Sequence, residues 1–220
     1  MSAPDVLVVG AGITGVVAAL RLAEAGASVE VVDAYGPASM ASGWTLAGVR
    51  QSGRDPAELP LALEAVREWP DLAERLGAPT HYRQDGNLRL ARTPAEVATI
   101  RQLVEDQRAA GLDLHFLPDN RAVRELAPLS ESVLAASFCP TDGHADPVAT
   151  VNAFKGAAER CGARFSIPER VLRLEQTAGG ITAVTARRQI DAGTVLLAAG
   201  TGTNALLKHL GAAIPLTVPM

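Results

Sequence analysis

The sequence contains little cysteine and has no long apolar run. Cys139 and Cys161 are the only cysteines in 220 residues, and their separation of 22 positions matches no metal-binding or redox motif. No uninterrupted apolar segment approaches the ~20 residues that a membrane-spanning helix needs. Charges of both signs are interspersed, without a polybasic block. We therefore expect no disulfide framework, no metal site, no membrane span and no nucleic-acid partner.

The first residues, MSAPD, also lack the basic region and apolar core of a cleavable export signal. Two cysteines in a chain without such a signal are typical of a reducing compartment. We expect a cytoplasmic protein. Cys161 falls on the apolar side of a predicted helix, so we expect its side chain to be buried.

Small and aliphatic residues dominate what the chain does contain. Apolar residues make up 48% of the sequence, aromatic residues only 4%, and the net charge is −4 at pH 7. A chain of this length can bury a substantial core, as one large domain or two smaller ones. The composition is typical of an α/β protein packed with Ala, Val and Leu.

The most informative motif lies at the N-terminus. Residues 5–15 read DVLVVGAGITG, an apolar run of strand length followed by G-x-G-x-x-G. Gly10 permits a tight turn, Gly12 lets the backbone approach a pyrophosphate, and Gly15 lets the following helix pack closely on the strand. A second apolar run ends at Asp33, 18 residues after the third glycine. This order predicts a dinucleotide-binding βαβ unit.

The acid and the helix start each have a physical role in such a unit. The N-terminus of the helix offers unpaired N–H groups and a positive dipole end to phosphates. The Asp33 carboxylate can accept hydrogen bonds from both hydroxyls of a ribose. Because it would repel a 2′-phosphate, the motif favours a cofactor other than NADP.

Turn and capping signals predict the other elements. Pro60 and Pro70 are expected to divide the second helix or cap its pieces. Asp85-Gly86 predicts a hairpin within 81–92, and Thr93-Pro-Ala-Glu96 is a capping box. The predicted helices are 13–25, 55–76, one from 94, one from 119 to 126 and one from 147, and the predicted strands are 133–139, 163–167, 171–175, 181–187, 189–190 and 194–200.

With these elements placed, the chain resembles the D-amino-acid oxidase and sarcosine oxidase family of FAD-dependent oxidoreductases, which includes glycine oxidases. The N-terminal pattern continues at the family's spacing to Val29. Residues 41–50, ASGWTLAGVR, are similar to the loop beneath the flavin, and residues 141–147, TDGHADP, to the family's D-G-x-x-D-P turn. Residues 195–200, VLLAAG, are similar to a late strand that ends in glycine against the cofactor.

The resemblance implies an α/β, Rossmann-type FAD-binding fold with a partial α+β substrate-domain insertion. The FAD-binding fold would occupy residues 1–80 and 145–220, and the insertion residues 81–144. The family's covalent attachment points are not recognisable, and Gly43 and Ala47 stand where sarcosine oxidases carry basic residues beside the flavin. We therefore expect FAD to be bound non-covalently.

The resemblance also implies which residues contact FAD. The glycine-rich turn would hold the pyrophosphate, and Asp33 the adenosine ribose. The segment 47–49 would line the isoalloxazine, and Val171 would meet the adenine through its backbone. The implied cofactor-binding residues are Gly10, Gly12, Ile13, Thr14, Gly15, Asp33, Ala34, Ser42, Gly43, Ala47, Gly48, Val49, Val171, Ala199 and Gly200.

Arg50 is the candidate catalytic-site residue. In the family, an arginine at the matching place in this loop helps to bind the substrate carboxylate, a task suited to the bidentate hydrogen bonds of a guanidinium. The alternative is an arginine that only anchors the loop or faces solvent. The resemblance thus implies oxidation of the C–N bond of an amino acid, or of an N-alkyl amino acid such as sarcosine.

The family would continue beyond residue 220 with a half that completes the substrate sheet. The alternative function is therefore a catalytically incomplete FAD-binding fragment or subunit that needs a partner chain. An open sheet edge would expose unpaired N–H and C=O groups, so we expect a second chain or a dimer mate to cover it. An NAD-dependent dehydrogenase is less favoured, because it leaves residues 41–50 and 141–147 unexplained.

Overall fold

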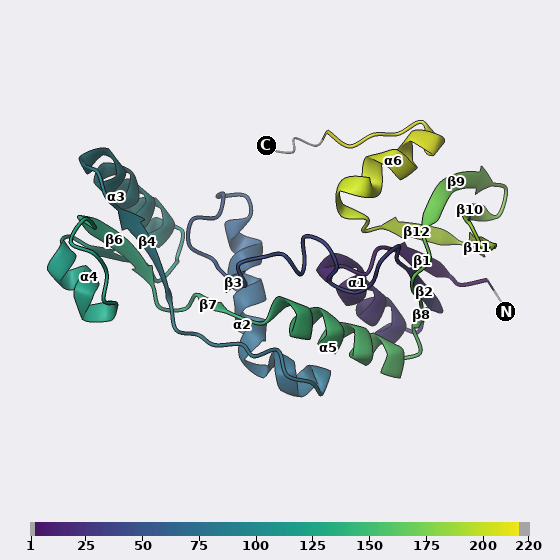
Figure 1. Cartoon of the computed structure of the whole chain (residues 1–220), viewed down its shortest axis with the longest axis horizontal. Coiled ribbons are helices and arrows are strands. Elements are labelled where there is room, and N and C mark those ends of the chain that lie inside the picture. Colours follow the sequence, from purple (N-terminus) through teal and green to yellow (C-terminus); the bar gives the residue numbers. More distant parts are fainter. Residues whose placement is uncertain (1–2, 216–220) are drawn as a thin grey trace. The chain divides into compact units, whose positions relative to one another are not determined.

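The computed structural model describes residues 3–215, which form two compact units (Figure 1). Unit 1 contains the chain up to Thr45, the short segment Leu76–Thr80, and the chain from Pro147 onward. Unit 2 contains Leu46–Arg75 and His81–Asp146. The segment after Thr45 thus groups with unit 2 by its contacts. The functional domain boundaries at 80 and 145 stay a prediction.

Unit 1 is built on a four-stranded parallel sheet in the order β12-β1-β2-β8. Its strands are β1 (Val6–Val9), β2 (Val29–Val32), β8 (Arg164–Ser166) and β12 (Thr194–Leu197). All three neighbouring pairs are parallel. Central strands of such a sheet are covered on both faces, which accounts for the nearly continuous apolar runs of β1 and β2. This sheet confirms the α/β class predicted from the sequence.

Two helices accompany this sheet, α1 (Ile13–Glu24) after β1 and α5 (Pro147–Arg160) before β8. The helix α1 buries one apolar face on β1 and β2, and α5 packs against α1. The helix α1 ends at the predicted place, where Gly26 has a φ of +87° beyond the C-cap. The helix α5 begins at Pro147, directly after Asp146, as expected. These local capping signals therefore place both helices correctly.

A three-stranded antiparallel sheet completes unit 1. It has the order β11-β10-β9 and consists of β9 (Val171–Thr177), β10 (Gly180–Thr185) and β11 (Gln189–Ala192). After β12 the chain forms η1 (Gly200–Gly202), α6 (Thr203–Leu207) and η2 (Lys208–Leu210).

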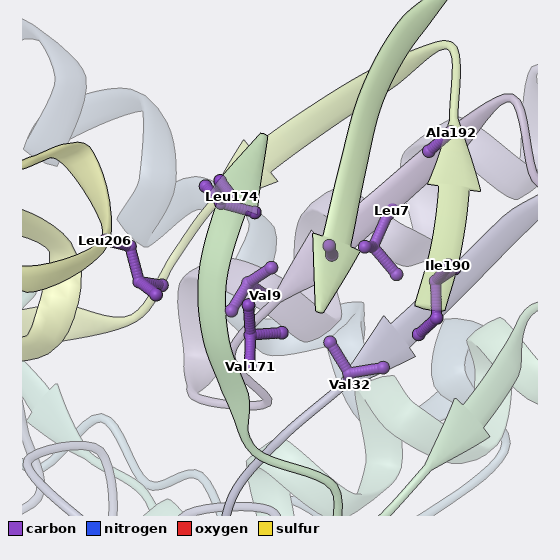
Figure 2. Close-up of a cluster of buried hydrophobic side chains, with 9 residues drawn as sticks. Leu7, Val9, Val32, Val171, Leu174, Ile190, Ala192 and Leu206 are labelled. Carbon is purple, nitrogen blue, oxygen red and sulfur yellow. The ribbon is translucent and has the colours of Figure 1, made fainter. Parts of the chain in front are cut away.

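One core cluster joins the two sheets of unit 1 (Figure 2). Leu7 and Val9 of β1 lie on the face that meets the antiparallel sheet. Side chains alternate across a strand, so Val8 lies on the opposite face, which α1 covers. The cluster consists of Leu7, Val9, Val32, Val171, Leu174, Ala183, Ile190, Ala192 and Leu206.

Unit 2 contains two small antiparallel sheets. The ribbon β3-β7 pairs β3 (Gly48–Val49) with β7 (Gly143–His144). The second sheet has the order β4-β6-β5. It consists of β4 (Asn87–Ala91), β6 (Ala135–Cys139) and β5 (His115–Leu117).

Three helices accompany these strands: α2 (Leu59–Leu76), α3 (Pro94–Ala109) and α4 (Asn120–Leu126). The predicted capping box opens α3, where the Glu96 N–H donates to Thr93 Oγ1 and the Glu96 carboxylate accepts from the Thr93 N–H. Ile100 and Val104 of α3 are buried in the core cluster of the β4-β6-β5 sheet. The predicted Asp119 cap of α4 is also confirmed, since its carboxylate accepts from the Ala122 N–H.

The predicted hairpin around Asp85-Gly86 is wrong. Arg83 instead exchanges backbone hydrogen bonds with His144, and the Gly86 N–H donates to the Asp142 carbonyl. The strand β4 pairs with β6, not with the segment that precedes Gly86. The Asp-Gly step therefore forms no hairpin turn, and the Gly86 N–H bonds to a residue far away in the sequence.

Two further expectations require correction. Pro70 lies inside α2 and does not divide it, so the helix forgoes only the N–H bond that proline cannot donate. Cys161 is exposed, because α5 ends at Arg160 and Cys161 no longer lies on its apolar face. Among the described residues, no helix is long and apolar enough to cross a membrane. The cytoplasmic location stays a prediction.

A buried ion network supports unit 1 on the β2 side. Glu30 of β2 accepts hydrogen bonds from the Ser166 hydroxyl, at 2.7 Å, and from the Arg188 guanidinium. Arg188 also donates to Glu169 at 3.0 Å. Burial alone would raise the pKa of Glu30, but Ser166 and Arg188 outweigh it and hold that pKa below its ordinary value. The charged carboxylate is therefore the form that stabilises the fold.

We predict that Gly10→Ala destabilises unit 1 far more than Gly26→Ala. Both glycines have positive φ, +117° and +87°, but a Cβ at Gly10 would lie 2.3 Å from the Ala198 carbonyl oxygen, whereas one at Gly26 meets nothing within 4 Å. Strain alone should cost about 1 kcal/mol at Gly26, and strain plus overlap about 3 kcal/mol at Gly10. Urea unfolding measures both, and equal losses would contradict the prediction.

We also predict a pH-dependent effect of Glu30→Gln. A depressed pKa contributes stability at neutral pH that is lost as the pH falls through the folded-state pKa. The variant should lose about 2 kcal/mol of unfolding free energy at pH 7, and the difference from the wild type should shrink below about pH 4. The control is Glu24→Gln, which breaks an exposed pair with Arg21 and should cost under about 0.5 kcal/mol. A difference that stays constant with pH would argue against the network.

Candidate functional site

The glycine-rich turn follows β1 at the carboxyl end of the parallel sheet. The Gly10 N–H donates to the Val32 carbonyl, and the Ala198 N–H donates to the Val9 carbonyl, both at 2.8 Å. A Cβ at Gly15 would lie 1.9 Å from the Gly10 carbonyl oxygen. A Cβ at Gly10 would lie 2.3 Å from the Ala198 carbonyl oxygen, so only glycine fits at positions 10 and 15. The glycines therefore bring α1, β1 and the end of β12 into close backbone contact.

The start of α1 carries backbone amides that the protein does not use. The Ile13 N–H donates to Ser42 Oγ at 3.0 Å. Within residues 3–215, the amides of Gly12, Thr14 and Gly15 have no hydrogen-bond partner. Unpaired amides at a helix N-terminus are suited to a phosphate group. The turn thus offers free amides of the kind that bind phosphates, and contact with a pyrophosphate stays a prediction.

Asp33 lies beside the same turn. Its Oδ2 accepts from the Ala11 N–H, and its Oδ1 accepts from the Tyr35 and Gly36 N–H groups, all at 2.8 Å. A carboxylate has about four acceptor positions, so Oδ2 retains room for one further donor. This arrangement suits a ribose hydroxyl. Three backbone N–H groups already occupy acceptor positions of the Asp33 carboxylate, which the sequence motif alone does not indicate.

The loop after β2 brings Ser42 to the helix start. The Gly43 N–H donates to the Met40 carbonyl, and a Cβ at Gly43 would lie 1.9 Å from the Ala38 carbonyl oxygen. A tight turn therefore fixes Ser42. Its Oγ accepts from Ile13 and lies 3.0 Å from where a Cβ of Gly12 would be. The Ser42 hydroxyl proton remains free to be donated to a ligand at the amides.

Four other expected cofactor residues also belong to unit 1. Ala34 follows Asp33 and is half-buried. The Val171 side chain is buried in the core, so only its backbone is available to a ligand. Ala199 follows β12, and Gly200 opens η1 with a φ of +55° and is exposed. Their contact with a cofactor stays a prediction.

Ala47, Gly48, Val49 and Arg50 belong to unit 2. The Ala47 carbonyl accepts from the Ala145 N–H at 3.1 Å, and the next two residues form β3. The Val49 side chain is buried against Val66 and Ala145 in the core of unit 2. At this position only the backbone is therefore available to a ligand, and contact of the segment with a flavin stays a prediction.

Arg50 has a guanidinium that the rest of unit 2 leaves unpaired. Its side chain runs along Gly48, where a Cβ would lie 3.3 Å from Arg50 Cδ and Nε. Among the described residues, no carboxylate forms an ion pair with Arg50. The residue is only half-buried. A free guanidinium in this state can bind an external carboxylate.

Sequence reasoning missed how the loop after Arg50 is held. The buried Asp142 carboxylate accepts from the Gln51 N–H at 2.7 Å and from the Ser52 N–H at 3.3 Å. The buried Gln107 side chain binds the Gly53 N–H at 3.0 Å. The available signal was the D-G-x-x-D-P turn, which indicates a structural acid but not its partner.

The remaining reactive side chains offer no second site. Burial raises the pKa of the Cys139 thiol to about 11, so it is inert at neutral pH. Burial, together with the charge of Asp142, also raises the pKa of the Tyr82 hydroxyl. The described residues contain no group of three or more side chains able to hold a metal ion.

Comparisons with known proteins identify the family of the chain. The profile of the family described as FAD dependent oxidoreductase matches residues 5–220. Human mitochondrial dimethylglycine dehydrogenase is 27% identical over 216 residues, which cover 96% of this chain and 25% of that protein. An opine oxidase subunit from Rhizobium meliloti is 27% identical over 226 residues, which cover 96% of this chain and 60% of that protein.

The fold is similar to that of a solved amino-acid oxidase. The crystal structure of glycine oxidase from Geobacillus kaustophilus matches with a TM-score of 0.90 at 24% identity, over 96% of this chain and 59% of that chain. This chain therefore spans between a quarter and three fifths of the length of these relatives. The family match covers nearly every residue, and the chain belongs to the FAD-dependent oxidoreductase family.

Proposed function

We propose that this chain is the FAD-binding portion of an enzyme that oxidises the C–N bond of an amino acid, or of an N-alkyl amino acid such as sarcosine. The observation that carries the proposal is the set of unpaired amides at Gly12, Thr14 and Gly15, beside the Asp33 carboxylate. Relatives named for dimethylglycine and glycine support the substrate class. Because the chain spans only part of these relatives, the activity is proposed for the complete protein that contains it.

The residues of unit 1 would hold the adenosine and pyrophosphate parts of FAD. The free amides at the start of α1 would bind phosphate oxygens, and the Ser42 hydroxyl would donate a further hydrogen bond. Asp33 Oδ2 would accept from a ribose hydroxyl. We propose that these contacts are non-covalent, since the chain shows no attachment point recognisable from the family.

Arg50 would hold the substrate carboxylate through paired N–H donors. The bound flavin supplies the two-electron acceptor for the reaction. The chain's own task is to hold and orient the amino acid. A substrate fixed through its carboxylate presents the carbon next to its nitrogen in one orientation, which is the main demand of such a reaction.

A second candidate is an FAD-binding subunit that works only with a partner chain. The opine oxidase relative, of which this chain spans 60%, is itself named as a subunit. Among the described residues, β4 and β5 are the outer strands of a three-stranded sheet, and each pairs only with β6. An added strand could pair with either edge. Co-purification of a second polypeptide would favour this candidate, and a single active polypeptide would exclude it.

We predict that Ser42→Ala weakens FAD binding about tenfold, because one hydrogen bond to a phosphate is lost. Flavin should be released from the wild-type protein by acid precipitation, which prepares apo-protein for a fluorescence titration with FAD. The control is Ser39→Ala in the same loop, whose hydroxyl binds only the Gly36 carbonyl and should leave the affinity unchanged. Flavin that stays with the precipitated protein would contradict non-covalent binding. A purified protein without any flavin, which also fails to bind added FAD, would contradict the FAD-binding role.

We predict that Arg50→Gln in the complete protein lowers kcat/KM for amino-acid substrates about 100-fold, since a charge-assisted pair of hydrogen bonds is lost. The loss should be small for an amine without a carboxylate, and the affinity for FAD should not change. The control is Arg67→Gln, an exposed residue paired with Glu64. Equal losses for both kinds of substrate would show that Arg50 does not bind the carboxylate.

A further inference from the structure

The Asp142 carboxylate is fully buried and has no cationic partner among the described residues. Most of its hydrogen bonds come from the two residues that follow Arg50, and the Cys139 thiol is also a hydrogen-bond partner. Gln51 donates its backbone N–H at 2.7 Å and its side-chain amide at 3.4 Å, and Ser52 donates its backbone N–H at 3.3 Å and its hydroxyl. A buried charge is costly unless it is well hydrogen-bonded. The loop after Arg50 thus provides the donors that Asp142 needs.

The chain before Arg50 is held by the residues that follow Asp142. The strand β3 pairs with β7, with Gly48 opposite His144 and Val49 opposite Gly143. The Ala145 N–H also donates to the Ala47 carbonyl at 3.1 Å. One short segment, residues 142–145, therefore fixes the backbone on both sides of Arg50.

Further contacts hold the remainder of this loop. The Asn87 side-chain amide donates to the Ser52 hydroxyl at 3.2 Å. Gln107 accepts from the Gly53 N–H at 3.0 Å and donates to the Arg54 carbonyl at 3.1 Å. Arg54 Nε in turn donates to the Arg50 carbonyl at 3.3 Å. Every backbone segment around Arg50 is anchored, whereas its guanidinium is not.

We propose that Asp142 is a positioning residue that sets the orientation of Arg50 toward a substrate carboxylate. The proposal rests on the proposed function, because it assumes that Arg50 binds that carboxylate. Asp142 acts through the backbone of Gln51 and Ser52 and leaves the guanidinium free for the ligand. A directly paired arginine would already have its charge neutralised, so anchoring through the backbone suits a residue that must bind an outside anion.

The test is a double-mutant cycle between Asp142→Asn and Arg50→Gln in the complete, FAD-loaded protein. Acetate serves as the carboxylate probe, and its Kd is measured from the change in flavin absorbance. Asp142→Asn keeps the shape of the side chain but replaces one carboxylate oxygen, an acceptor, with an NH₂ group, a donor. That group would face the donors of Gln51 and Ser52. We expect the single change to raise the acetate Kd about tenfold, to raise the KM for sarcosine more than it lowers kcat, and to leave the Kd for FAD unchanged.

In the Arg50→Gln background, Asp142→Asn should change the acetate Kd less than about twofold, because its effect passes through the missing guanidinium. Additive effects would overturn the proposal, since they would show a general structural role. An Arg50→Gln protein with wild-type acetate affinity would instead refute the carboxylate role in the proposed function. If Arg50→Gln weakens acetate binding as expected but Asp142→Asn leaves the acetate Kd unchanged, only the positioning role of Asp142 is refuted.

Two other variants keep the test interpretable if Asp142→Asn fails to fold. Ser52→Ala removes the hydroxyl that donates to Asp142 and accepts from the Asn87 side-chain amide. We expect the acetate Kd to rise about threefold in the presence of Arg50 and to stay unchanged in its absence. Asp119→Ala removes the side-chain cap of α4 in the same unit and makes no contact with residues 47–54. It should lower the stability but leave the acetate Kd unaltered. If the acetate Kd rises with Asp119→Ala, the effect is due to a loss of stability alone.

Discussion

Unit 1 depends on a close approach of three backbone segments where β1 ends. Gly10 and Gly15 carry no side chain where a Cβ would overlap a carbonyl oxygen of the neighbouring segment. This contact allows α1 to start directly at the sheet, with its first amides at the carboxyl ends of the strands. It also allows β12 to pair with β1, so that the end of β12 lies beside the turn. The geometry that we propose for phosphate binding therefore follows from the packing of the backbone.

In unit 2, a short segment organises the loop that carries Arg50. Residues 142–145 contribute a buried carboxylate, a two-residue strand and a backbone amide, and each binds a different part of residues 47–52. The loop has little regular structure of its own. Its conformation is set by hydrogen bonds to buried partners, as the role proposed for Arg50 requires.

The sequence predicts those features whose physical causes are local. The βαβ unit follows from glycine spacing and apolar runs, and the starts of α3 and α5 follow from capping residues. The hairpin at Asp85-Gly86 failed because the hydrogen bonds of this segment go to residues 142–144, which no local signal reveals. The burial of Val49 was missed for the same reason, since it depends on distant packing partners. The motif around Asp142 was recognised, but its partner 91 positions earlier could not be inferred from the pattern alone.

The pairing of β1 with β12 has a consequence for the order in which the protein is made. The glycine motif is synthesised well before Thr194–Leu197, the strand that pairs with β1. The loop around Arg50 likewise lacks its hydrogen-bond partners until residues 142–145 have been synthesised. Contacts between such distant positions slow folding, because a long stretch of chain must be closed before they form. During synthesis, β1 therefore remains an incomplete edge until residues 194–197 have been made.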